Sequence, residues 1–155
     1  MAKRVKKSIV PDSIVLDKIY FIRGQKVMID ADLANLYQVE TKQLKRQVKR
    51  NIERFPEDFM FELNSKEVKN LRSQIGTSSY GGNRYATMAF TEQGVAMLSS
   101  VLNSETAIRV NIQIIRVFAK MRKLLLSHKD IMLKLNNWKE RSAVIIMTFK
   151  LFFNV

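Results

Sequence analysis

The sequence predicts an α+β fold: small β-hairpins with a helix-turn-helix, followed by a long C-terminal helix that continues into a short coiled coil. Two β-rich segments, residues 19–22 and 27–29, flank a turn that contains Gly24. After Asp30, apolar residues recur every three or four positions, which is typical of helices. The same spacing returns after Ser104 and continues to Trp138, as in a heptad repeat.

We expect a single domain over residues 14–126, because a chain of 155 residues is long enough for one hydrophobic core and too short for several. Residues 1–13 form a basic lead-in of the kind that is usually mobile. Residues 127–155 form a C-terminal extension that ends in an apolar tail.

Two helices are predicted after the first hairpin, with only residues 38–40 between them. Asp30 and Thr41 are each expected to cap one of them. The buried face of the first helix is predicted to hold Leu33, Leu36 and Tyr37, and that of the second Leu44, Val48, Ile52 and Phe55. Small Ala34 would let the two helices cross closely, and Val39 would fill the angle between them.

The middle of the chain predicts two further strands and two further helices. Alternation from Phe59 to Leu63 indicates a strand, and Asn64 with Glu67 forms a capping box for a short helix. Residues 76–84 have the composition of a loop, and residues 85–90 read as a strand. Thr91 is expected to cap the next helix, in which Gly94 indicates a close packing contact.

The long helix carries two apolar stripes. The first has the spacing of a heptad seam and comprises Ala107, Val110, Ile114, Val117, Met121, Leu124, His128, Ile131, Leu135 and Trp138. The second, formed by Ile108, Ile112, Ile115 and Phe118, widens the apolar surface, so we expect the start of this helix to be buried in the domain. The later part of the seam, from Met121 onward, fits a second copy of the helix and therefore a homodimer.

Charge and composition indicate the class of partner. Lys and Arg number 27 against 14 Asp and Glu, a net charge of +13, so the chain should attract polyanions, with nucleic acid favoured over an acidic membrane surface. The absence of cysteine excludes disulfides and thiolate metal sites and suits a reducing cytoplasm. No export signal and no membrane-spanning run is evident, and we expect no metal and no cofactor.

The second helix of the predicted pair has one strongly cationic face, which we expect to contact double-stranded DNA. Only Glu53 offsets its six cations, whereas an ordinary solvated face mixes the two signs of charge. The candidates for contact with base edges are Lys42, Gln43, Lys45, Arg46 and Gln47. The candidates for contact with phosphates are Lys49, Arg50 and Arg54, and Arg84 could join them if the loop acts as a wing rather than as a plain solvent loop.

Several segments resemble the ORF-six-N family of phage and bacterial DNA-binding domains, which is related to KilA-N and Bro-N domains. They are IRGQKVM at 22–28, DLA at 32–34, YQVETK at 37–42, VKRN at 48–51, RFPEDF at 54–59 and FTEQGVAML at 90–98. The resemblance covers about residues 14–126. It implies an α+β DNA-binding module of the kind found in prophage-type regulators and antirepressor-like proteins.

The predicted function is therefore sequence-specific binding of double-stranded DNA, and two alternatives stay open. One is an RNA-binding module, and the other is a protein-interaction module that acts without specific DNA readout. An enzyme is not expected, because the single histidine, His128, lies on the heptad seam. A nuclease built from Asp12 and Glu40 would require acids that converge from strands, and Glu40 falls in the turn between two helices.

Overall fold

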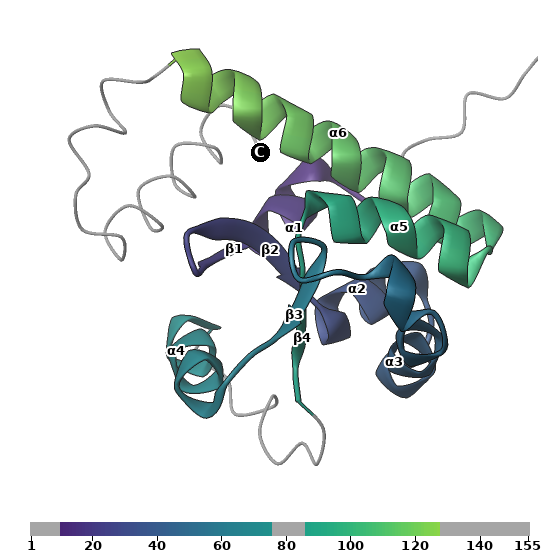
Figure 1. Cartoon of the computed structure of the whole chain (residues 1–155). Coiled ribbons are helices and arrows are strands. Elements are labelled where there is room, and N and C mark those ends of the chain that lie inside the picture. Colours follow the sequence, from purple (N-terminus) through teal and green to yellow (C-terminus); the bar gives the residue numbers. More distant parts are fainter. Residues whose placement is uncertain (1–9, 76–85, 128–155) are drawn as a thin grey trace, which may run out of the picture.

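A four-stranded antiparallel sheet forms the centre of the fold, which confirms the predicted α+β class (Figure 1). The computed structural model describes residues 10–75 and 86–127. The strand order is β1-β2-β4-β3, with β1 (Tyr20–Ile22), β2 (Gln25–Ile29), β3 (Met60–Glu62) and β4 (Met88–Phe90). Phe90 of β4 pairs with Met28 on one side and with Met60 on the other. The sheet thereby joins the N-terminal hairpin to the second half of the domain.

Helices pack around this sheet. They are α1 (Asp12–Asp17), α2 (Asp30–Tyr37), α3 (Thr41–Arg50), the 3-10 turn η1 (Ile52–Arg54), α4 (Ser65–Ile75), α5 (Glu92–Leu102) and α6 (Glu105–Ser127). Figure 1 shows α5 and α6 side by side at the top of the molecule, whereas α3 and α4 lie on either side of the lower end of β4. Among the described helices, none is both long enough and apolar enough to cross a membrane.

The first hairpin forms where the sequence predicts it. Tyr20 pairs with Val27 and Ile22 with Gln25, so the turn consists of Arg23 and Gly24. Both turn residues have positive φ, 55° for Arg23 and 72° for Gly24, as a two-residue turn between twisted strands requires.

Helix α1 is not predicted by the sequence, and it ties the beginning of the described chain to α6. Val15 and Leu16 are its two buried residues, too few to show a helical period. The backbone N–H of Val10 donates to the Gln113 side chain at 3.3 Å, and Lys120 pairs with Asp12 at 2.8 Å. Helix α1 therefore begins within the segment expected to be a mobile lead-in.

Two of the four predicted helix caps are confirmed and two are wrong. Thr91 accepts a hydrogen bond from the Gly94 N–H, and Asn64 and Glu67 exchange the two bonds of a capping box. Asp30 and Thr41 instead occupy the first helical positions of α2 and α3, and neither preceding residue makes a side-chain cap. The Asp30 carboxylate is used for tertiary contacts that are described below.

The long helix α6 buries the first predicted stripe up to Met121 and only part of the second. Val110, Ile114 and Met121 are at most 1% exposed, because they face the domain core. Ile108 and Ile112 are 42% and 48% exposed, so the prediction of burial is wrong for these two members of the second stripe. It is confirmed for Phe118, which is fully buried, and Ile115 is partly buried against the same core. Met121 is buried inside the domain, so it is not available to a partner helix. A seam between two copies of the helix therefore cannot begin at Met121. Its later members, from His128 to Trp138, lie outside the described residues.

Candidate nucleic-acid interface

Helices α2 and α3 and the turn between them form the predicted helix pair. Gln38 ends α2 in the left-handed region at φ 61°, which redirects the chain. The Val39 N–H donates to the Ala34 carbonyl at 3.0 Å, and the half-buried Val39 side chain packs against the core. Ala34 is 1% exposed, as expected for a small residue at a close crossing. The turn and the crossing of α2 and α3 are thus held by contacts on the core side of the helix pair.

The inner side of α3 anchors the helix, and its outer side is polar. Leu44 and Val48 are fully buried. The exposed residues of the helix are Lys42, Gln43, Arg46, Lys49 and Arg50. At about 100° per residue they cover an arc of roughly 120° opposite the buried pair, with Arg46 near its centre. This arc brings together five of the nine residues predicted to contact DNA.

Three of the four cations on this arc are not compensated by residues that the structure describes. Helix α3 contains no acidic residue. Lys42, Arg46 and Arg50 make no hydrogen bond and no ion pair with any residue that the structure describes. Cationic side chains without intramolecular partners remain available to an anionic ligand, and a duplex presents a regular row of phosphates.

Lys45 differs from its neighbours, because its ammonium group points into the domain. Its side chain is 11% exposed and lies 3.2 Å from Asp30 Oδ2. The ammonium group also donates to the Ala86 carbonyl at 2.7 Å. Asp30 Oδ2 accepts the N–H of Met88 at 2.9 Å, so this buried carboxylate joins α2, α3 and β4. In the structure Lys45 therefore fastens α3 to the sheet instead of lying on the outer arc.

Of the other three predicted residues, Gln47 and Arg54 lie at or beyond the edge of the arc. Gln47 is half-buried, and its carbonyl accepts a hydrogen bond from Asn51 at 2.9 Å. Arg54 belongs to η1, because α3 ends at Arg50, and its guanidinium lies 3.5 Å from the Ser100 hydroxyl. Arg84 lies outside the described residues.

The early end of α3 also corrects the prediction for Ile52. A continuous helix would place Ile52 on the buried face, but the chain turns at Asn51 and Ile52 is 55% exposed. Phe55 alone returns to the core, where its ring meets Phe90 edge-on at a centroid distance of 5.9 Å. The break therefore confines the helical part of the cationic face to α3.

A buried polar network supports the helix pair from the opposite side. The Tyr37 hydroxyl donates to the Asn111 side-chain oxygen, and Asn111 Nδ2 donates to the Val95 carbonyl at 2.6 Å. Burial raises the pKa of Tyr37 above its usual value, so the hydroxyl keeps its proton and remains a donor. These bonds connect α2 to α6 and α5.

Comparison with known proteins identifies the family of this chain. No curated protein and no solved structure matches it. The family model of the ORF6N domain matches residues 17–101, which is more than half of the 155 residues and spans the chain from α1 to α5. This agrees with the resemblance to ORF-six-N domains seen in the sequence motifs. The chain belongs to the ORF6N domain family.

Proposed function

We propose that this chain binds double-stranded DNA sequence-specifically through the outer arc of α3, as a prophage-type transcriptional regulator or an antirepressor-like protein. The observation that carries the proposal is the arc itself: four exposed cations and a glutamine, with no acidic residue in the helix, on a helix whose other side is anchored in the core. A helix of this width fits the major groove of B-DNA. Membership of the ORF6N family supports the same assignment.

The position of each residue on the arc suggests its role. Arg46 lies near the centre and Lys42 and Gln43 in the first turn, where a groove-bound helix approaches the base edges. Arginine recognises guanine and glutamine recognises adenine by paired hydrogen bonds. Lys49 and Arg50 lie in the last turn, where a helix leaves the groove and meets the phosphate backbone.

Salt dependence tests the phosphate contacts. Replacement of Lys49 or Arg50 by alanine should make the log-log dependence of affinity on salt shallower by about 0.9 each, because each neutralised phosphate releases counterions. The loss of affinity should be similar on all duplex sequences. Fluorescence anisotropy over a series of salt concentrations measures both quantities, and unaltered slopes would remove these residues from the interface.

Selection of bound sites from random duplex DNA tests the base contacts. Arg46→Ala or Gln43→Ala should change the selected sequence at one position, with a loss of about 1 to 3 kcal/mol of discrimination at that position. Arg50→Ala is the matched control, since it should leave the selected sequence unchanged. If Arg46→Ala weakens every site equally, Arg46 only positions the helix.

Two alternatives to DNA binding predict a different preference among nucleic acids. An RNA-binding module would prefer RNA, and a protein-interaction module without DNA readout would bind no nucleic acid at physiological salt. Competition among duplex DNA, duplex RNA and single strands at matched salt distinguishes them. Our proposal requires that duplex DNA compete best and that affinity persist at physiological salt. A homodimer through the chain after Ser127 would add an inverted repeat to the selected site.

A further inference from the structure

The exposed side of α4 carries two further cations that have no partner in the described part of the chain. Lys66 and Lys69 lie about one helical turn apart and are exposed. Neither forms a hydrogen bond or an ion pair within the described part of the chain. On the other side of the helix, Val68 and Leu71 pack against the apolar cluster of the sheet. Helix α4 thus has the same division as α3, with one side packed and the other cationic.

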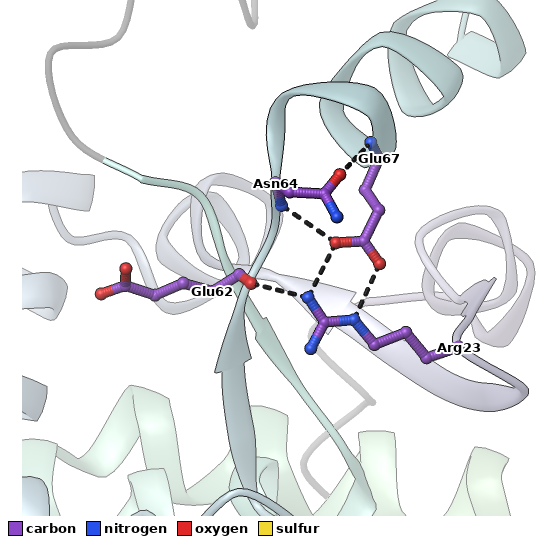
Figure 2. A network of polar contacts seen from close by, with 4 residues as sticks. All are labelled: Arg23, Glu62, Asn64 and Glu67. Atoms are coloured by element: carbon purple, nitrogen blue, oxygen red, sulfur yellow. Dashed lines mark hydrogen bonds and ion pairs between the residues drawn. The ribbon is translucent and has the colours of Figure 1, made fainter.

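The single acidic residue of α4 does not compensate these lysines, because it is turned toward the first hairpin. Figure 2 shows the Glu67 carboxylate between the Arg23 guanidinium and the start of the helix. It accepts bonds from Arg23 Nε at 2.8 Å, Arg23 Nη2 at 2.9 Å and the Asn64 N–H at 2.9 Å. The bond from Arg23 lowers the pKa of Glu67 below its usual value, so the carboxylate stays ionised and paired with the guanidinium.

Arg23 is itself held in place by three further features. It lies in the tight turn between β1 and β2 with φ 55°, and its Nη2 atom also donates to the Glu62 carbonyl at 3.1 Å. Its guanidinium lies 4.4 Å from the centre of the Phe61 ring. The hairpin therefore fixes the N-terminal end of α4, and the two lysines project from a defined position.

The residue before α4 and a side chain of α3 bond to adjacent residues of the chain just before β4. The Leu63 N–H, just before α4, donates to the Thr87 carbonyl at 2.8 Å. The adjacent carbonyl, of Ala86, accepts the bond from Lys45 of α3 at 2.7 Å. The two residues just before β4 thus contact both elements, and Figure 1 shows α3 and α4 on either side of the lower end of β4. A ligand that covers this end of the sheet would meet both helices.

We propose that α4 is a second contact with duplex DNA, in which Lys66 and Lys69 bind the phosphate backbone flanking the groove that α3 occupies. The proposal rests on DNA binding by α3. Lysine is a mobile point charge, which suits phosphate contacts and carries no sequence information. Helix α4 would therefore add affinity and fix the orientation of the domain on the duplex, while α3 supplies the sequence preference.

The experiment compares three forms of the full chain: the parent, Lys66→Ala with Lys69→Ala, and Arg116→Ala with Lys123→Ala. The last pair removes the same charge from exposed positions of α6, on the far side of α5 from α3. Affinity for one selected duplex and one random duplex is measured over a series of salt concentrations. The α4 variant should show a slope shallower by about 1.8 and equal weakening on both duplexes, since two phosphate contacts are lost. The α6 variant should retain the parental slope.

Thermal unfolding of the three forms serves as a check on folding. Because Lys66 and Lys69 have no partner in the described structure, their removal should leave the midpoint unchanged. A slope equal to that of the α6 variant would overturn the role of α4. If the parent binds the selected duplex and Arg46→Ala changes its preference, that failure concerns α4 alone. If the parent does not bind duplex DNA, both this inference and the proposed function fall.

Discussion

Gly94→Ala is expected to lower the free energy of unfolding by about 3 kcal/mol or more, because the new methyl group would overlap the backbone of a neighbouring segment. A Cβ atom at this position of α5 would lie 1.9 Å from the Phe59 carbonyl oxygen and 2.8 Å from its carbon. That oxygen cannot move aside easily, since it accepts the Thr91 N–H at 3.0 Å. The clash should outweigh the gain of up to about 1 kcal/mol that alanine brings to a helix interior.

Thermal unfolding monitored by circular dichroism measures this effect. A loss of about 3 kcal/mol corresponds to a decrease of roughly 6 to 12 °C in the midpoint for a chain of this size. Ala96→Ser is the matched control, since Ala96 is exposed on the same helix and the change should stay within about 0.5 kcal/mol. An unchanged or higher midpoint for Gly94→Ala would show that α5 does not approach Phe59 this closely.

Lys45→Ala is expected to be the most damaging change in α3, with a loss of about 3 to 5 kcal/mol in the free energy of unfolding. It would leave the Asp30 carboxylate, which is 3% exposed, without its cation and would free the Ala86 carbonyl. Lys42→Ala removes the same side chain from an exposed position one turn earlier and should cost no more than about 0.5 kcal/mol.

A double variant separates the lost charge from the lost packing. Lys45→Met with Asp30→Asn removes both charges and keeps an oxygen that can accept the Met88 N–H, so it should recover much of the stability. In the folded protein, Lys45→Ala should also leave the salt slope of DNA binding unchanged. Two results together would instead show that Lys45 contacts DNA. The Lys45→Ala and Lys42→Ala variants would be equally stable, and Lys45→Ala would make the salt dependence of DNA affinity shallower.

Local patterns in the sequence predict the helix pair, the hairpin and the close contact at Gly94. Each of these depends on residues that are near one another in the chain: the spacing of Leu44 and Val48, the Gly24 turn, or a glycine inside a helix. The outer arc of α3 follows from the same period, because the residues opposite a buried pair must be exposed. For this reason the sequence identifies five of the candidate DNA contacts that the structure brings together.

Features that depend on tertiary contacts could not be predicted in this way. Nothing in the spacing of Asp30 and Lys45 reveals that they meet, since the crossing of two helices brings them together. The exposure of Ile108 and Ile112 depends on which side of α6 the rest of the domain covers, and both stripes have a helical period. The expected burial of Ile52 is wrong because the helix stops at Arg50 without a glycine or proline to mark its end.

The bond between Tyr37 and Asn111 has a consequence for the alignment of α6. A buried polar pair can specify the register of packed helices, because a shifted register leaves its polar groups unpaired. A slip of α6 by one turn would bury the Tyr37 hydroxyl and the Asn111 amide without partners, at about 1 to 3 kcal/mol for each group. This polar pair thus pins the register of a helix about 34 Å long. We therefore expect a shift of α6 along its axis to displace α2 with it, because a shift of α6 alone would break this pair.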